Sequence, residues 1–600
     1  MSDYIFSSCQ QSKLFLADKI ASIYQDSAPK IFEYHGEWGS LAVSQQHYNG
    51  FLPFENEQHI CVVLGAPVLY FRDNNFLTKT DSSFATESIY RRWVVEKKMI
   101  WDKDLSGPFT VFLIDKTLKE INAVTDLMTF IPIYNHTKSS DVWLSSHVDA
   151  LAKACGEQYE LDEVSLADFI LNDVVTFPFT VYKNIRQLKP GTAYHWQANE
   201  QNPTESIYWQ PLEEFNFASI DQAATELRSG IQRYVNTVSE NMPKLAQFIS
   251  AGEDSRALSG MLPQEKSRDA YIFLDHMNRE GIIAKKVAKA YKANFTAGYR
   301  SKTHYLDILP EASILVGAGH QYTHAHSLGF DKKYKLAEYP AVFGGYLSDS
   351  LLKGAFVPKV RGAGRFPFVP DFEINRSPVG KSLSKYISIV NTDVLESIKL
   401  RQSEHFEFIK RIRPTTANEW FVLYPASMRV AIPNYYSTRR LFKSYEPFLS
   451  HESVKVASSV PTSWKLNRRL FNRAVKPFLK PSQYMLHADG RLPYFSFIPN
   501  IPLQSSIWFY RHIAKRLGLI KGNQGPWGDW ANVFSSEQWN NQLQENSKKH
   551  KLSFFTEDIV RLAKSNQLNS SQKTSLMQVL NFVKIREPLS YLTEDAQTRK

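Results

Sequence analysis

The chain has 600 residues, of which 43% are hydrophobic and 22% charged, and its net charge is +11 at pH 7. This length exceeds what one hydrophobic core supports, so we expect two or more domains in a soluble globular protein. The longest apolar stretch, residues 60–71, is too short to cross a bilayer, and the first residues lack the features of a secretory signal. We therefore expect a cytoplasmic protein without a membrane partner.

The positive charge is spread along the chain. Basic pairs such as Lys285-Lys286 and Arg468-Arg469 occur, but no long basic block does. A solvated surface explains this pattern better than a nucleic-acid-binding face, so we do not expect a nucleic-acid partner. The three cysteines, Cys9, Cys61 and Cys155, form neither a disulfide framework nor a zinc spacing, which is typical of a reduced compartment.

Short β-like runs separated by turn residues fill the first 200 residues. They predict strands over residues 60–64, 67–71, 109–114, 131–134 and 142–145, with helices near 85–95 and 166–171. The polar stretch 198–204 is typical of a linker. We therefore predict a β-rich domain over residues 1–205 and a second domain over residues 206–600.

The second domain begins with helical spacing and then alternates between strands and helices. Apolar residues between 220 and 235 line one face of a predicted helix. Strands are predicted over 245–249, 270–274 and 340–343, each followed by a helix. This alternation predicts an α/β fold with a mainly parallel sheet, in which ligands bind at the carboxyl ends of the strands. The polar loops 250–256 and 344–350 occupy that position.

The loop Ser250-Ala251-Gly252-Glu253-Asp254-Ser255-Arg256 joins a predicted strand to a predicted helix. Such a turn presents backbone N–H groups and a helix N-terminus to a phosphate. The carboxylate of Asp254 would repel a phosphate unless a divalent cation, usually Mg2+, lay between them. The loop therefore predicts a site for nucleotide phosphate and a metal. A simpler interpretation is an N-capped helix after a strand, which needs only one Asp or Ser.

Both loops resemble segments of one enzyme family. The first, residues 250–255, resembles the pyrophosphate loop Ser-Gly-Gly-x-Asp-Ser of asparagine synthetases and their relatives, the β-lactam synthetases among them. The second, Gly345-Tyr346-Leu347-Ser348-Asp349-Ser350-Leu351, resembles the family's Gly-x-Gly-x-Asp-Glu-Leu. Residues 445–451 resemble its Arg-x-Pro-Phe-Leu-Asp-His segment. Several amino-terminal segments are similar to the family's glutaminase-like domain: residues 105–109, Asp115, Asp126, residues 132–134 and residues 185–191.

The resemblance covers most of the chain and implies two domains. The first would be an αββα domain of the Ntn-hydrolase type, similar to class II glutamine amidotransferases. The second would be a parallel-sheet synthetase domain of the ATP pyrophosphatase type, similar to adenine nucleotide α-hydrolases, with a helical carboxy-terminal region. We expect the tryptophans of that last region, Trp508, Trp527 and Trp530, to lie in a core.

The implied reaction uses ATP and Mg2+. A carboxylate would attack the α-phosphate of ATP and release pyrophosphate, and ammonia or an amine would then displace AMP to form an amide. The residues implied to bind ATP and its pyrophosphate are Ser250, Ala251, Gly252, Asp254, Ser255 and Gly345. Asp254 and Asp349 would hold Mg2+, and Phe273 and Leu274 would contact the adenine.

The chain departs from the family at its amino terminus. Glutamine-hydrolysing members expose a cysteine as the mature first residue, whereas position 2 here is Ser2 and Cys9 lies too far along the chain. We expect Cys9 to be a small buried residue. The amino-terminal domain should then fold like a glutaminase without hydrolysing glutamine, so that nitrogen comes from free ammonia, a partner or an amine of the substrate.

The synthetase part departs from the family as well. Arg469 stands where the family has a lysine that stabilises the adenylation transition state, and Glu253 and Ser350 are further differences. Tyr346 either packs on its loop or passes a proton, as a Tyr paired with a Glu does in the β-lactam branch. Glu419 is a position to check for that partner.

Other classes of function stay open. The same departures suit a catalytically degenerate scaffold that binds nucleotide, and the basic charge allows an RNA-modifying enzyme of the same nucleotide fold. The spacing of His320, His324 and His326 allows a metal pair, but no acidic or cysteine ligand completes it. Asp275-His276 lies where it could border the adenine pocket. The carboxylate, which is a small molecule or a peptide, and the amine are not identified, and a homodimer stays open.

Overall fold

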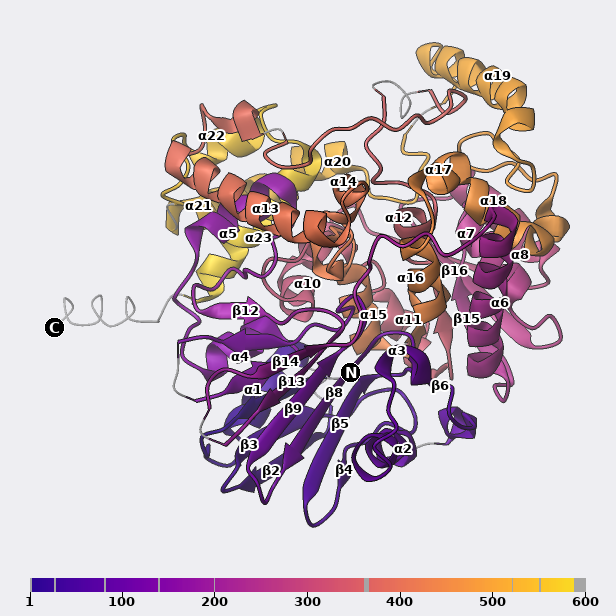
Figure 1. The fold of residues 1–600 in the computed structure, drawn as a ribbon. Coiled ribbons are helices and arrows are strands. Elements are labelled where there is room, and N and C mark those ends of the chain that lie inside the picture. Colours follow the sequence, from indigo (N-terminus) through magenta and orange to yellow (C-terminus); the bar gives the residue numbers. More distant parts are fainter. Residues whose placement is uncertain are drawn as a thin grey trace.

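Two antiparallel six-stranded sheets form the amino-terminal part of the protein (Figure 1). The structure is a computed structural model that describes residues 3–25, 29–79, 82–138, 141–198, 200–360, 366–381, 383–520, 522–549 and 552–586. The first sheet has the order β12-β10-β11-β1-β3-β2 and the second the order β14-β13-β9-β8-β5-β4.

The chain passes back and forth between the two sheets. The first sheet contains β1 (Tyr4–Ser7), β2 (Ile31–Gly36), β3 (Gly39–Ser44), β10 (Tyr134–His136), β11 (Trp143–Ser145) and β12 (Ile185–Gln187). The second contains β4 (Phe54–Glu55), β5 (His59–Gly65), β8 (Phe109–Asp115), β9 (Glu120–Thr125), β13 (Thr192–Trp196) and β14 (Thr204–Ile207). A separate short pair is formed by β6 (Val68–Leu69) and β7 (Leu105–Ser106).

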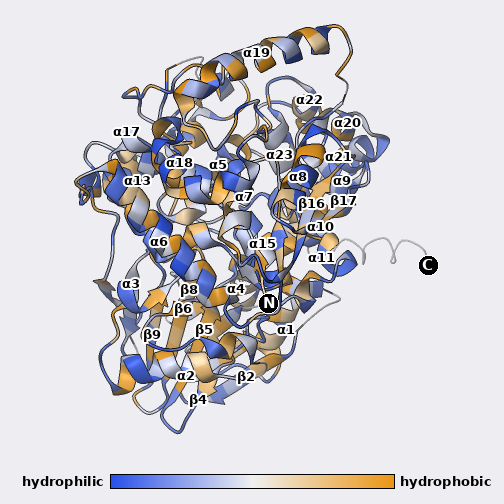
Figure 2. Ribbon diagram, turned by 90° about the vertical axis from the view of Figure 1, so that its right-hand side faces the viewer, coloured by the Kyte–Doolittle hydropathy of each residue, from blue (hydrophilic) through white to orange (hydrophobic). Residues whose placement is uncertain are grey.

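The period of two along β1 sends alternate side chains to the two faces of the first sheet. Tyr4 and Phe6 pack against Phe112 of β8, with ring centroids 4.9 and 5.2 Å apart, and so join the two sheets. Ile5 points to the opposite face, into the hydrophobic cluster formed with helices α1 (Phe15–Tyr24) and α4 (Val148–Ala154). Residues of β5 and β8 are buried along nearly their whole length, and these two strands are predominantly hydrophobic (Figure 2).

A five-stranded parallel sheet forms the centre of the second part, as the alternating pattern predicts. Its order is β17-β16-β15-β18-β19, and all four neighbouring pairs are parallel. Its strands are β15 (Lys244–Phe248), β16 (Ser267–Leu274), β17 (Asn294–Tyr299), β18 (Val342–Phe343) and β19 (Ser444–Tyr445). The helices that follow β15, β16 and β18 are α7 (Glu253–Met261), α8 (Arg279–Ala290) and α12 (Ser348–Leu352).

One predicted boundary needs correction. The polar stretch 198–204 does not lead out of the amino-terminal part, because the strand at its end, β14, pairs with β13 from Thr204 to Ile207. Connections between paired strands and interdomain linkers share the same polar residues, so composition does not separate them. The connection to the second part runs from residue 208 to α6 (Ile220–Ser239), the predicted amphipathic helix.

The carboxy-terminal region is helical, as predicted, and returns to the amino-terminal part. Helix α23 (Ser570–Arg586) contacts α5 (Glu163–Asn172), as does α13 (Thr392–Ile412). Its other helices are α19 (Phe497–Arg516), α20 (Trp530–Ser535), α21 (Glu537–Lys549) and α22 (Ile559–Lys564), and α19 lies at the edge of the molecule in both views (Figures 1 and 2). No described helix is both long and apolar enough to cross a membrane.

The contact between the sheets gives a first prediction. Phe112 is completely buried between Tyr4 and Phe6, so Phe112→Ala should lower the free energy of unfolding by about 3–5 kcal/mol through lost burial and a residual cavity. Chemical denaturation followed by circular dichroism measures this. Phe372→Ala, which removes the same side chain from a position that is 61% exposed, is the control and should change stability little. Equal effects of the two substitutions would contradict the sandwich packing.

Candidate functional site

A cavity of about 600 Å³ lies at the carboxyl ends of β15, β16 and β18. The polar loops 250–256 and 344–350, which follow β15 and β18, both contribute to its lining, as the sequence predicts. The lining also includes residues from α8, from the segment 468–491 and from the segment 526–527, which are distant in sequence. The cavity therefore joins the predicted phosphate loop to regions that the motifs do not cover.

The loop after β15 closes on itself through its two serines. The backbone N–H of Ser250 donates to Ser255 Oγ at 3.0 Å, and the N–H of Gly252 donates to Ser250 Oγ at 3.0 Å. The third N–H, of Ala251, donates to the Glu280 carboxylate on α8 at 2.7 Å. These three groups are thus already satisfied. Ala251 is completely buried and does not line the cavity, which contradicts its expected role as a phosphate contact.

The first turn of helix α7 supplies backbone N–H groups that can donate hydrogen bonds to an anion, which the loop does not. It begins at Glu253 after Gly252, and within the described part of the chain no side chain caps its first turn. The initial N–H groups of a helix have no partner within the helix and carry the positive end of its dipole. Gly252, Asp254 and Ser255 line the cavity at this point. The start of α7 can therefore bind an anion, although the donors differ from those expected.

Lys353 lies among the carboxylates that the sequence assigns to a metal. Its ammonium is 2.6 Å from Asp254 Oδ1 and 3.4 Å from Glu253 Oε1, and it also forms an ion pair with Asp349. Asp349 and Lys353 are four residues apart around α12, so both face the cavity. Burial acts to lower the pKa of Lys353, but the surrounding carboxylates hold it above its ordinary value, so the ammonium is charged.

The same cluster contains two arginines. Glu253, which is almost completely buried, is 3.1 Å from Arg491 Nη2 and 3.6 Å from Arg468 Nε. Burial alone would raise the pKa of Glu253, but Arg491, Lys353 and Arg468 hold it well below its ordinary value. Burial and the neighbouring carboxylates raise the pKa of Asp254 to about 7 against the effect of Lys353.

This arrangement does not fit the expected Mg2+ site. A bound Mg2+ needs carboxylate oxygens that are free to approach it at about 2.0–2.1 Å, whereas the Lys353 ammonium lies against Oδ1 of both Asp254 and Asp349. No group of three or more His, Cys, Asp or Glu side chains suited to a metal occurs in the described residues, and this includes His320, His324 and His326. His320 instead hydrogen-bonds Tyr134 at 3.1 Å.

The second loop places Tyr346 at the cavity, but the Tyr346 phenol is not in the deprotonated form that could accept a proton. Its hydroxyl is buried and has no hydrogen-bond partner among the described residues. Burial and the nearby Glu446 raise the pKa of Tyr346 well above its ordinary value, although Arg429 opposes this, so the phenol stays protonated. Glu446 accepts the Tyr346 N–H at 3.0 Å. A Cβ at Gly344 would lie 2.2 Å from Glu446 Oε1, so this approach requires glycine.

Of the two other residues considered with Tyr346, Gly345 lies at the cavity and Glu419 does not. Gly345 lines the cavity and lies against Asp254, whose Cβ would be 3.3 Å from an added side chain. Glu419, the suggested partner for Tyr346, instead forms a buried ion pair with Lys465 at 3.0 Å and does not line the cavity. Glu419 therefore does not pair with Tyr346, and Glu446 is the carboxylate that accepts a hydrogen bond from the loop backbone.

Arg469, which the sequence interpretation places at the site, does not line the cavity, but the preceding residue, Arg468, does. Arg469 is exposed and donates to Ser463 O at 3.4 Å. Asn467 and Arg468 both have left-handed backbone angles, with φ of 54° and 59°, which turn the chain between two helices. This turn, which costs about 1–2 kcal/mol per residue, directs Arg468 inward and Arg469 outward.

Of the two residues expected to contact adenine, only Phe273 lines the cavity. Phe273 lines the cavity and stacks on Phe330 with centroids 4.2 Å apart. Leu274 is completely buried in the cluster under α8 and points away, because successive strand residues face opposite sides. Trp527 lines the cavity and is 54% exposed, which contradicts its expected place in a core. Asp275 pairs with Arg300 at 2.8 Å, and Arg300 rather than Asp275 lines the cavity.

Several lining residues were missed by sequence reasoning. The i, i+4 spacing of Asp349 and Lys353 was a usable signal for an ion pair. Glu280 lies in the first turn of α8, where acidic residues are common in any helix. Its position in the sequence therefore does not indicate that it accepts a hydrogen bond from Ala251. Arg491 and Trp527 lie in no motif, and only the tertiary structure brings them to the cavity.

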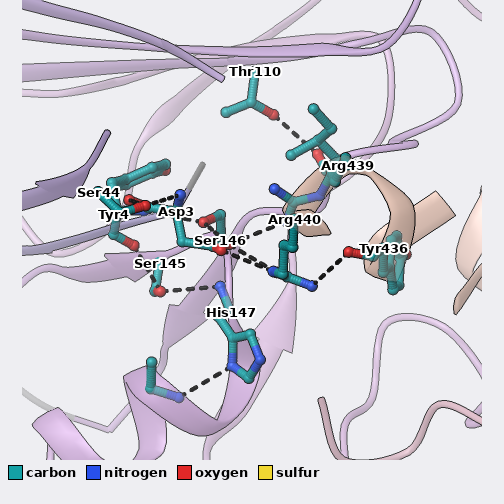
Figure 3. Close-up of polar contacts among 12 residues, drawn as sticks. Asp3, Tyr4, Ser44, Thr110, Ser145, Ser146, His147, Tyr436, Arg439 and Arg440 are labelled. Atoms are coloured by element: carbon teal, nitrogen blue, oxygen red, sulfur yellow. Dashed lines mark hydrogen bonds and ion pairs between the residues drawn. The ribbon is translucent and has the colours of Figure 1, made fainter. Parts of the chain in front are cut away.

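The amino-terminal strand carries a second buried polar cluster (Figure 3). Asp3 accepts hydrogen bonds from Arg440 Nη2 at 2.7 Å, Arg440 Nε at 2.8 Å and Arg439 Nη2 at 3.0 Å. Tyr24 and Ser146 donate to the same carboxylate at 2.5 and 2.8 Å. Asp3 is completely buried and both arginines lie on α15 (Pro433–Leu441) of the second part. The cluster therefore joins the two parts of the molecule.

The cysteine prediction is wrong in one respect. Cys9 is exposed, just beyond the end of β1, and its sulfur lies 3.8 Å from the carbonyl oxygen of Gln10. Cys61 is buried in β5, where burial raises the pKa of its thiol. Ser2 lies outside the described residues.

The amino-terminal sandwich is of the glutamine amidotransferase type. Residues 69–209 match the family model described as a glutamine amidotransferase domain. No curated protein matches the chain. The solved structure of the allosteric regulatory enzyme of purine biosynthesis is 7% identical, with a TM-score of 0.25, and the similarity covers 50% of this chain and 80% of that one. Glutamine phosphoribosylpyrophosphate amidotransferase from B. subtilis, complexed with ADP and GMP, is 9% identical, with a TM-score of 0.25 and coverage of 51% and 92%. These scores are too low to establish a common overall fold.

The Asp3 cluster gives a second prediction. Asp3→Asn leaves two buried guanidinium groups without their carboxylate, so the free energy of unfolding should fall by about 3–5 kcal/mol. Burial alone would raise the pKa of Asp3, but Arg440 and Arg439 hold it well below its ordinary value. The contribution of the Asp3 carboxylate to stability is therefore present at neutral pH and is lost only as the pH falls. Thermal unfolding measures it. The exposed Asp18→Asn is the control, and a similar melting temperature for both variants would contradict the assignment.

The sequence departure at the amino terminus gives a third prediction. The purified protein should release no glutamate from glutamine, because Asp3 rather than a cysteine stands at the start of β1 and Cys9 lies beyond the end of that strand. A coupled glutamate dehydrogenase assay measures this, with added glutamate as the positive control. Glutamate release that Cys9→Ser abolishes would show instead that Cys9 is a nucleophile.

Proposed function

We propose that the protein is an ATP-dependent carbon–nitrogen ligase related to the asparagine synthetases, which activates a carboxylate as an acyl-adenylate and transfers it to an amine. The observation that carries this proposal is the uncapped start of α7, which opens into a cavity at the carboxyl ends of three parallel strands. This is the place where α/β sheets bind ligands and where a helix start binds phosphate. The loop motifs and the amidotransferase-type sandwich support the family assignment.

The cavity offers separate groups to the two ends of ATP. The phosphates would bind at the start of α7, near Ser255 and the guanidinium groups of Arg468 and Arg491. Fixed cations at such a position neutralise the charge that develops on a leaving pyrophosphate. The aromatic residues Phe273 and Trp527 line the same cavity and would take the adenine.

The amine would not come from glutamine bound to this chain. The exposed Cys9 offers no amino-terminal nucleophile, and Asp3 occupies the start of β1 with two arginines of the second part. Free ammonia, ammonia from a partner or an amine of the substrate would therefore be the nucleophile. Because the Tyr346 phenol stays protonated, it would donate a hydrogen bond and not remove a proton.

Exchange of labelled pyrophosphate into ATP, screened against small carboxylates and carboxylate-bearing peptides, tests the proposal. We expect one class of carboxylate to support exchange. Ser255→Ala removes the hydroxyl that organises the loop through Ser250, and we expect about tenfold weaker ATP binding, or about 1.4 kcal/mol. Ser259→Ala, one turn along the same helix and outside the cavity lining, is the matched control. Absence of ATP binding by the wild type would contradict the proposal.

A catalytically degenerate nucleotide-binding scaffold is the second candidate. The pairing of Lys353 with Asp254 and Asp349 favours it, because those carboxylates are not free to act. Tight ATP binding without exchange for any carboxylate would support the scaffold, whereas exchange would exclude it.

A further inference from the structure

The ammonium of Lys353 occupies the point at which three carboxylates of the cavity converge. Lys353 and Glu253 have side chains that are 6% and 2% exposed, whereas that of Asp349 is 70% exposed. The ammonium also lies 4.9 Å above the ring of Phe471, which limits its movement away from the carboxylates. This side chain is therefore part of the wall of the cavity.

The charges of the cluster largely offset one another without a metal. Lys353, Arg468 and Arg491 face Glu253, Asp254 and Asp349, and Arg491 also pairs with a fourth carboxylate, Asp489. A buried charge is stable only when it is paired, so removing either sign would be costly. A divalent ion bound between Asp254 and Asp349 would have to displace the ammonium and would add two positive charges beside the two guanidinium groups. The residues therefore disfavour the metal that the family resemblance implies.

We propose that Lys353 is the internal cation of this cavity and that a pyrophosphate-bearing ligand binds there without a divalent ion bridging it to Asp254 and Asp349. This rests on the proposed function for the identity of the ligand. Asp349 is the most exposed of the three carboxylates, so a phosphate oxygen of the ligand takes its place beside the ammonium while Asp254 and Glu253 keep Lys353 in position. An ammonium and two guanidinium groups then face the phosphates.

Binding of Mn2+ to the protein without nucleotide tests the first half of the inference. Free Mn2+ is measured by electron paramagnetic resonance during titration with wild-type protein. We expect no stoichiometric Mn2+ site in the wild type. Lys353→Met removes the charge but keeps the length of the side chain, and it should bind Mn2+ at least about tenfold more tightly through the freed carboxylates.

Lys359→Met is the matched control, because Lys359 lines the same cavity but pairs with Asp371 at 2.9 Å. It should leave Mn2+ binding unchanged. A stoichiometric Mn2+ site in the wild type that Asp254→Asn abolishes would overturn the inference. This wild-type measurement decides the question even if Lys353→Met does not fold.

Binding of ATP in EDTA and in MgCl2 tests the second half. We expect the wild-type dissociation constants in the two solutions to agree within about threefold, a difference below 0.7 kcal/mol. ATP binding that occurs only with MgCl2 would overturn this inference and leave the proposed function intact. Absence of ATP binding in both solutions would instead contradict the proposed function and remove the ligand assumed here.

Discussion

The arrangement of the two parts depends on the buried carboxylate of Asp3. Two adjacent arginines of α15, Arg439 and Arg440, converge on it and are themselves almost completely buried. Charges in such a position are stable only when they are paired and hydrogen-bonded, so the start of β1 and helix α15 must keep their relative position. Helix α15 ends shortly before β19, an edge strand of the parallel sheet, so the constraint extends to the frame that carries the cavity.

The same electrostatic rule shapes the cavity. Its polar part contains nearly as many fixed positive as negative groups, held by ion pairs among α7, α12 and the segment 468–491. Water is largely excluded from Glu253 and Lys353, which strengthens each of these interactions relative to the same pairs in solvent. A ligand entering such a network must exchange one partner for another, so the cavity would select ligands by the geometry of their charges as well as by their sign.

The parallel sheet and its loops could be predicted because buried parallel strands form continuous apolar runs that end in polar turns. Both ends of β15 therefore lie within one residue of their predicted positions. The connection between β13 and β14 could not be distinguished from an interdomain linker, because both kinds of segment are polar. Arg468 points inward because Asn467 and Arg468 have left-handed backbone angles. The residue types at these two positions do not predict that conformation. Contacts such as Lys353 with Glu253 join distant segments and are set only by the tertiary fold.

The carboxy-terminal helices give the molecule a property that its two-part plan does not suggest. One hydrophobic cluster contains Ile5 and Leu16 from the sandwich, Leu315 from α10 (Leu309–Val316) and Leu576 from α23. Modular enzymes exchange whole domains by recombination because few contacts cross the boundary between the domains. Here the boundary passes through a shared core. The amidotransferase-type part must therefore evolve together with the part that carries the cavity.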